Sequence, residues 1–114
     1  MRVTSELWVS ALLKRIFGEG GFAAVRRRGA HEAGAVFVIR RLRTGELELY
    51  APAPQTSYDE ARPSERQFLR ALVTADENEM ERRLERETRF DPDVWLVEIE
   101  TADEAGSYLT LASE

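Results

Sequence analysis

The spacing of apolar residues changes along the chain from helical to extended and back. In residues 4–17 they recur every three or four positions, which predicts an amphipathic helix capped by Thr4 or Ser5. The glycine-rich residues 18–21 then end this helix. A phosphate-binding loop has the opposite order, because it follows a strand and opens a helix, so these glycines are interpreted as a stop signal. The apolar positions of the helix are Trp8, Val9, Leu12, Leu13, Ile16 and Phe17.

Residues 35–51 have the pattern of a β-hairpin, with an apolar run, a turn at Thr44-Gly45 and an alternating second half. A two-residue loop there places opposite charges across the ladder on one side and apolar residues on the other. The predicted cross-strand pairs are Arg43 with Glu46, Arg41 with Glu48, Ile39 with Tyr50, Leu42 with Leu47 and Val38 with Ala51. Arg40 then shares a face with leucines, so we expect its guanidinium to reach solvent or a carboxylate at Asp91, Asp93 or Glu98.

The remaining pattern completes a single α+β domain spanning residues 1–114. Residues 22–28 and 94–100 are predicted strands, and residues 64–74 and 77–89 are predicted helices that begin at a capping box from Ser64 to Gln67 and at Asp76. Residues 108–111 add a short strand or fray. The predicted order is α-β-β-β-α-α-β, with a three- to four-stranded, mainly antiparallel sheet and the helices packed on one face.

Composition limits the chemistry that this domain can carry. Hydrophobic residues make up 43% of the 114 positions and charged residues 32%, which is typical of a folded domain. There is no cysteine and one histidine, so disulfides, thiolate metal sites and cysteine nucleophiles are excluded, and neither a metal nor a cofactor is predicted. No stretch approaches the roughly 20 apolar residues of a membrane span, and the first residues lack a leader pattern. We therefore expect a cytoplasmic protein that binds no membrane.

Charge is unevenly distributed, and this suggests one alternative function. Residues 1–45 carry nine Lys or Arg against three Asp or Glu, although the whole chain has a net charge of −5. An arginine ridge on the predicted strands could bind the phosphates of a nucleic acid. The alternative is a solvated strand end, which is favoured because no aromatic residues are interleaved to stack bases. The ridge residues are Arg26, Arg28, Arg41 and Arg43.

Residues 51–63 contain three prolines and no apolar period. Loops of this length in small domains are often binding segments, and proline lowers the entropy cost of ordering them. A simple crossover from the sheet to the helices is the competing interpretation. The candidate binding residues in this loop are Gln55, Tyr58, Asp59 and Arg62.

Asp91, Pro92 and Asp93 form a rigid turn before the last strand, and Asp91, Asp93 and Trp95 are further binding candidates. The two carboxylates also suggest a metal-assisted hydrolase, with Glu98 or Asp59 completing the site. Aspartates beside proline more often stabilise the turn itself through backbone hydrogen bonds. No histidine or nucleophile accompanies them, so no catalytic residue is assigned.

Several segments, which span nearly the whole chain, form a recognisable pattern when taken together. They are residues 8–11, 18–20, 22–25, 50–55, 59–63 with Arg66 and Phe68, and 89–95. Together they resemble a small bacterial family of the alphaproteobacterial type that carries only the label "domain of unknown function". The resemblance implies no activity, cofactor or catalytic residue.

These observations favour a non-enzymatic, cytoplasmic protein-interaction module whose surface combines the 51–63 loop with the 91–95 turn. The partner is an unidentified protein, and the sequence does not set the oligomeric state. The nucleic-acid-binding protein and the metal-assisted hydrolase remain the two alternatives.

Overall fold

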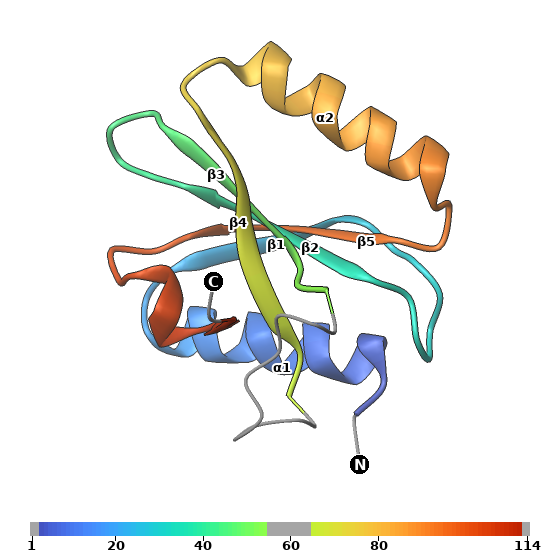
Figure 1. The fold of residues 1–114 in the computed structure, drawn as a ribbon. Helices are drawn as coiled ribbons and strands as arrows, with labels where there is room; N and C mark the ends of the chain where they lie inside the picture. Colours follow the sequence, from blue (N-terminus) through green and yellow to red (C-terminus); the bar gives the residue numbers. More distant parts are fainter. Residues whose placement is uncertain (1–2, 55–64, 113–114) are drawn as a thin grey trace.

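The computed structural model describes residues 3–54 and 65–112, which form an α+β domain as predicted (Figure 1). None of the described helices is both long and apolar enough to cross a membrane. The elements in chain order are α1 (Ser5–Gly18), β1 (Phe22–Arg27), β2 (Val36–Arg41), β3 (Leu47–Pro52), β4 (Gln67–Thr74), α2 (Glu77–Phe90), β5 (Trp95–Glu100), a short 3-10 helix η2 (Ala105–Ser107) and β6 (Thr110–Leu111).

The sheet has six strands in the order β1-β5-β2-β3-β4-β6, so the prediction of three to four strands is wrong. It is also mixed, because β5 runs parallel to β2 and β6 runs parallel to β4. The chain leaves β4, forms α2 and returns as β5 between β1 and β2. This crossover separates β1 from β2, so the first three strands of the chain are not all neighbours in the sheet.

Residues 67–74 are strand β4, although the sequence predicted a helix over residues 64–74. The spacing of Phe68, Leu69, Leu72 and Val73 fits a helix, but it also fits a strand with one extra residue. The ladder with β3 shifts between Arg70 and Leu72, which leaves Ala71 as a bulge. Phe68 thereby joins the core on one face and Leu72 packs on the other.

The hairpin between β2 and β3 forms, but its predicted register is wrong by one residue. Its loop has three residues instead of two and ends at Gly45, whose φ is +93°. The Leu42 amide donates to the Glu46 carbonyl at 2.9 Å, which closes the loop. The shift places Arg40 opposite Glu48 and Val38 opposite Tyr50.

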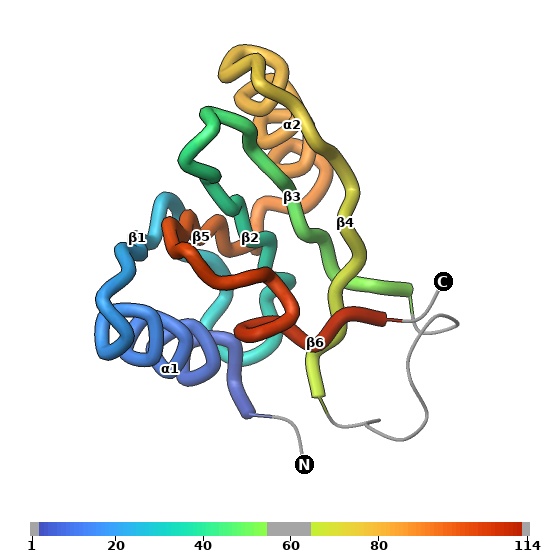
Figure 2. Tube along the Cα trace, turned by 90° about the vertical axis from the view of Figure 1, so that its left-hand side faces the viewer, coloured from blue at the N-terminus to red at the C-terminus, as the bar shows by residue number. Residues whose placement is uncertain are grey.

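The two helices cover opposite faces of the sheet, which corrects the prediction that they share one face (Figure 2). Val9, Leu12 and Ile16 of α1 pack in one core cluster. Met80 and Leu84 of α2 pack in the other. Two cores are possible because β2 and β5 are apolar on both faces, as strands with helices on either side are.

Both helices begin at the predicted caps. The Thr4 hydroxyl accepts a hydrogen bond from the Leu7 amide, and the Asp76 carboxylate accepts one from the Asn78 amide at 2.8 Å. α1 ends at the predicted glycines, where Gly20 has a φ of +85°.

Candidate interaction surface

The candidate residues Gln55, Tyr58, Asp59 and Arg62 lie outside the described residues. The described parts of the predicted surface are the exit from β3 and the 91–95 turn. Both lie at the same end of the sheet, because Val36 pairs with Trp95 and Val38 pairs with Tyr50. Pro52 is therefore level with Trp95 and two strand spacings away, or about 10 Å.

The 91–95 turn is held by hydrogen bonds from the end of β1 and from the loop that connects β1 to β2. The Ala30 amide donates to the Asp93 carbonyl at 2.9 Å, and the Arg27 guanidinium donates to the Pro92 carbonyl at 2.7 Å. The Asp91 carboxylate accepts from the Asp93 amide at 3.0 Å. This use of an aspartate to stabilise its own turn is the non-catalytic interpretation of the pair.

Trp95 is buried, with 1% of its surface exposed, so it does not offer its ring to a partner. Its indole N–H donates to the Ala30 carbonyl at 2.8 Å, and the Arg28 guanidinium lies 5.1 Å from the ring centroid. Trp95 therefore positions the turn and the loop beneath it. Asp93 beside it is exposed.

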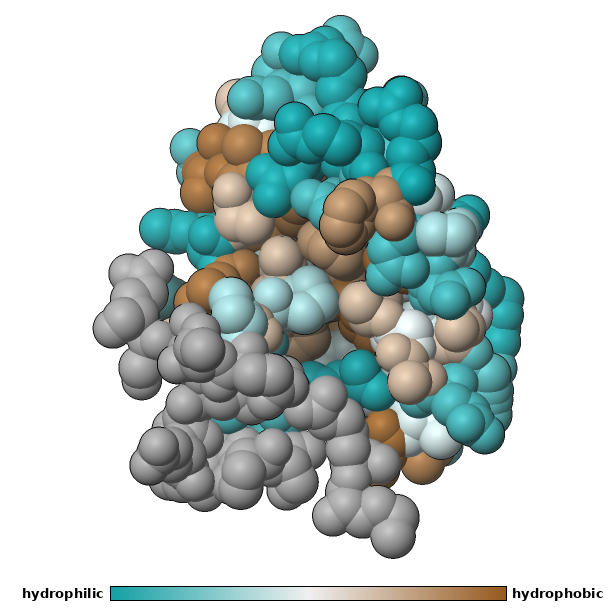
Figure 3. Space-filling view, turned by 45° about the vertical axis from the view of Figure 1, so that its right-hand side comes forward, coloured by the Kyte–Doolittle hydropathy of each residue, from teal (hydrophilic) through white to brown (hydrophobic). Residues whose placement is uncertain are grey.

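Phe90 is the residue that the sequence interpretation missed. Its side chain is 89% exposed, more than any other large hydrophobic residue among those described, and it directly precedes the turn. In the view of Figure 3, apolar side chains gather in the middle of the face that is drawn, below a cap of hydrophilic ones. Aromatic side chains are enriched in protein–protein interfaces relative to the rest of the surface.

The four arginines of the predicted ridge do not lie together. Arg26 and Arg41 are on the α2 side of the sheet, where both contact Glu98. Arg28 pairs with Glu6 of α1 on the other side. Arg43 makes no hydrogen bond or ion pair with the described residues.

Glu98 lies at the centre of a network of ion pairs between the sheet and α2. Its carboxylate lies 3.1 Å from Arg41 Nε and 3.5 Å from Arg26 Nη1. The same two arginines also bind α2, because Arg41 pairs with Glu77 and Arg26 with Glu81. The hydrogen bond from Arg41 lowers the pKa of Glu77. These contacts attach a helix that has only two buried side chains of its own.

Glu48 is the most enclosed carboxylate in the described part of the chain, with 6% of its surface exposed. It accepts hydrogen bonds from Arg40 at 2.8 Å, from the Tyr50 hydroxyl at 2.9 Å and from Arg70 at 3.3 Å. Arg40 also donates to the Asp103 carbonyl at 2.8 Å. The acidic partner expected for Arg40 is thus its neighbour across the hairpin, and not Asp91, Asp93 or Glu98.

Tyr50 is expected to ionise far above the usual tyrosine range. Burial, and then the hydrogen bond to Glu48, raise its pKa from 10.0 to about 12. The fold favours the neutral phenol, so this stabilisation is complete below pH 10 and is lost as the pH rises towards 12. Absorbance titration at 295 nm of wild type and Tyr50→Phe should differ by a step near pH 12. A step near pH 10 would contradict the buried hydrogen bond.

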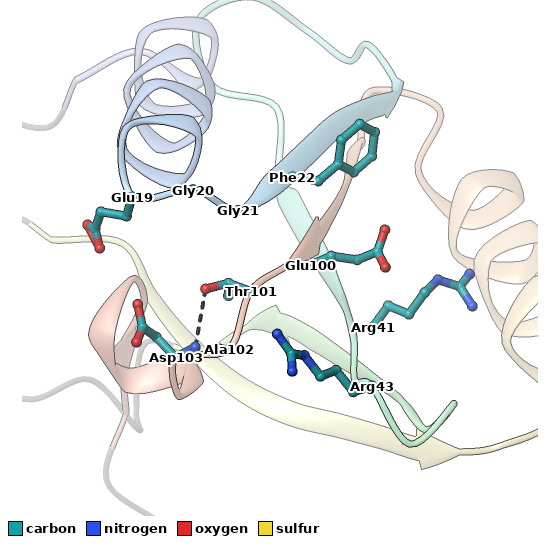
Figure 4. Close-up of a pocket in the computed structure, with 10 residues that line it drawn as sticks. All are labelled: Glu19, Gly20, Gly21, Phe22, Arg41, Arg43, Glu100, Thr101, Ala102 and Asp103. Atoms are coloured by element: carbon teal, nitrogen blue, oxygen red, sulfur yellow. Dashed lines mark hydrogen bonds between the residues drawn. The ribbon is translucent and has the colours of Figure 1, made fainter.

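A polar pocket of about 420 Å³ lies at the carboxyl ends of β2 and β5, at the opposite end of these strands from the 91–95 turn (Figure 4). Arg41 and Arg43 line one part of it, and Glu100 and Asp103 another. Arg43 and Glu100 make no side-chain hydrogen bond or ion pair with the described residues. The pocket brings opposite charges together but contains neither a histidine nor an activated nucleophile.

Within the described residues, no group of three or more His, Asp or Glu side chains is arranged to hold a metal ion. Asp91, Asp93 and Glu98 therefore do not form a three-ligand site with one another, and the fourth candidate ligand, Asp59, lies outside the described residues.

Comparisons with known proteins agree with this fold. The family described as "Protein of unknown function (DUF1491)" matches residues 3–108. No functionally curated protein matches the chain in sequence.

Three solved structures from two bacteria have the same fold. The chain is similar to protein Atu0922 from A. tumefaciens, with 51% identity over 100% of this chain and 98% of that one, and a TM-score of 0.83. It is also similar to a DUF1491 family protein from Caulobacter crescentus. The crystal structure of that protein has 31% identity over 97% and 99% of the two chains and a TM-score of 0.78, and an NMR structure from the same species has 32% identity, coverage of 99% of both chains and a TM-score of 0.74. The resemblance to an alphaproteobacterial family is thereby confirmed, and the chain belongs to the DUF1491 family of proteins of unknown function.

Proposed function

We propose that this chain is a cytoplasmic protein-interaction module without catalytic activity of its own. Its surface combines the predicted 51–63 loop with the 91–95 turn, at the end of the sheet where the chain leaves β3 and enters β5. The observation that carries the proposal is the exposure of Phe90 at that turn. When a partner covers an exposed aromatic side chain, the free energy of the system falls, which favours binding.

The rigidity of the turn supports the same proposal. Hydrogen bonds to the carbonyls of Pro92 and Asp93 and the buried Trp95 ring hold it in one conformation. A partner that binds a preorganised surface loses less conformational entropy on association. Phe90, Asp91 and Asp93 then offer one aromatic group and two carboxylates for recognition.

The proposal is tested by affinity capture from the native cytoplasm, with nuclease treatment and with low and high salt. The captured partners are compared between wild type, Phe90→Ala and a triple alanine variant at Gln55, Tyr58 and Arg62. We expect both variants to lose a partner that resists nuclease and salt, while the exposed Lys14→Ala on α1 keeps it. If both variants retain every partner, this surface is not the binding site.

The nucleic-acid alternative has weaker support, because carboxylates neutralise Arg26, Arg28 and Arg41. A binder of this kind would show affinity for nucleic acid that falls steeply with salt. Loss of all captured partners on nuclease treatment would favour it over the protein-interaction proposal.

A further inference from the structure

Among the described residues, the arginines that make no hydrogen bond or ion pair are concentrated on α2. Those on the sheet and in its loops are mostly paired, for example Arg40 with Glu48 and Arg26 with Glu98. Four described arginines make no hydrogen bond or ion pair with the described residues, and three of them belong to α2 and line a single groove. The four are Arg43, Arg82, Arg86 and Arg89.

The groove has a volume of about 540 Å³ and brings these α2 arginines together with Leu72 of β4. Arg82, Arg86 and Arg89 are spaced by four and three residues, so they lie along one side of the helix. Phe90 is four residues after Arg86 and lies on the same side. A row of cations therefore leads from Leu72 towards the exposed aromatic ring of the proposed interaction surface.

β4 contributes Leu72 to this groove, and beyond Phe68 its outer edge is not paired with any described strand. β6 pairs only with Gln67 and Phe68, and no other described strand lies on that side of β4 (Figure 2). The Phe68 carbonyl points outward, because it accepts from the Ala112 amide at 2.9 Å. Backbone groups alternate in direction along a strand, so those of Arg70 also point outward.

We propose that this groove and the free edge of β4 bind an extended acidic segment of the partner protein, with its carboxylates on the α2 arginines and its apolar side chains on Leu72 and Phe90. This inference rests on the proposed function and names the partner's chemistry. The bulge at Ala71 limits backbone pairing to a short stretch, so the arginines supply much of the recognition.

The spacing of charges fits a peptide. In an extended chain, side chains two residues apart lie on one side and are roughly 7 Å apart. Arginines one helical turn apart are separated by about 5–6 Å at Cβ, which their long side chains easily adjust. Acidic residues at every second position can therefore face the arginine row, and apolar residues at the two ends of the same side can cover Leu72 and Phe90.

Nucleic acid fits the groove less well. Glu79 and Glu85 also line it, and they repel a backbone that carries a phosphate at every nucleotide. A peptide can place neutral residues opposite these two carboxylates. The Thr74 hydroxyl already donates to Glu79 at 2.5 Å, which keeps that carboxylate turned towards β4.

The test is a peptide-display experiment in which random 12-residue peptides are selected for binding to the full-length chain at low salt. We expect the enriched sequences to carry Asp or Glu at every second position, with Leu, Ile or Phe two residues before or after them, on the same side of the extended peptide. One enriched peptide, labelled and measured by fluorescence anisotropy, should bind at least roughly tenfold more weakly to the triple variant Arg82→Gln, Arg86→Gln, Arg89→Gln. Arg43→Gln is the matched control, because Arg43 is equally unpaired but lies in the other pocket, and it should bind as wild type does.

Unchanged thermal midpoints will show that both variants fold, since none of these arginines holds the fold together. The inference is overturned if no peptide is enriched, if the enriched peptides lack acidic residues, or if the triple variant binds them as wild type does. It is also overturned if a labelled 20-nucleotide RNA or DNA competes for the same arginines. If a partner is captured through Phe90 and also binds the triple variant as well as wild type, the proposed function is retained. In that case only the inference that the partner binds through an acidic segment is overturned.

Discussion

Glu48→Gln is expected to destabilise the domain by about 3 to 5 kcal/mol, the usual cost of removing one partner from a buried ion pair. The Arg40 side chain is 11% exposed, so it cannot regain the lost interaction by turning into water. Its charge would then face only neutral acceptors, the glutamine amide oxygen and the Asp103 carbonyl. The Tyr50 hydroxyl would lose its charged acceptor at the same time.

Urea denaturation followed by circular dichroism measures this change in the free energy of unfolding. Glu46→Gln is the control, because Glu46 is exposed in the same hairpin, and it should change stability by less than roughly 0.5 kcal/mol. A loss below about 1 kcal/mol for Glu48→Gln would show that the Arg40 pair contributes little to stability.

The effect of Glu48 should also depend on pH. Burial raises the pKa of Glu48, but the hydrogen bonds from Arg40 and Tyr50 and the charge of Arg40 outweigh it, so the pKa lies below its ordinary value of 4.5. The fold therefore favours the ionised form, and this stabilisation is present above pH 4.5 and lost as the pH falls through the lower folded pKa. The difference between wild type and Glu48→Gln should narrow as the solution is acidified below pH 4.5.

Gly29→Ala is the second substitution with a large expected effect, about 3 kcal/mol or more. A Cβ atom at Gly29 would collide with the Asp93 carbonyl oxygen, and would lie 2.6 Å from the Val94 carbonyl carbon and 2.7 Å from Trp95 Cδ1. Backbone atoms cannot move aside as the end of a flexible side chain can. The turn that carries the proposed surface would therefore be displaced.

Gly18→Ala is the matched control for this prediction. Nothing lies within 4 Å of a Cβ at Gly18, which ends α1 and has no positive φ. It should be neutral or stabilise by up to about 1 kcal/mol, because alanine favours the helix. Equal thermal midpoints for the two variants would contradict the close packing of Gly29 on the turn.

Parts of the fold were predictable because local chemistry decides them. Thr4, Asp76 and the glycines after α1 mark helix ends through hydrogen bonds to nearby residues, and both helices begin and α1 ends where these residues indicate. The hairpin was predicted for the same reason. Its register was not, because a two-residue and a three-residue loop both fit the sequence around Gly45, and apparent charge pairing favoured the wrong one.

The larger errors concern contacts between distant residues. β4 was predicted as a helix because its apolar residues have helical spacing, and its strand conformation comes from pairing with β3. The continuous apolar runs in β2 and β5 were a usable signal. Strands buried on both faces have such runs, so helices on opposite sides could have been inferred.

The candidate surface was partly predictable. Proline and aspartate marked the 91–95 turn, but Trp95 was assigned to binding and is buried. Phe90 could have been identified, because it lies well off the helical stripe that contains Met80 and Leu84. The arginines of α2 that make no ion pair could not have been identified from the sequence. Several pairings of Arg with Glu are possible along this helix, and only the structure shows that Arg83 pairs with Glu87.

Site-specific photo-cross-linking tests the proposed interaction surface most directly. A benzophenone amino acid replaces Phe90, Pro54 or, as a control, Lys14, and all three positions are exposed. We expect the same partner protein to cross-link from positions 90 and 54 after irradiation of living cells, and not from position 14. Cross-links from position 14 alone, or from none of the three, would contradict the assignment of this end of the sheet as the interaction surface.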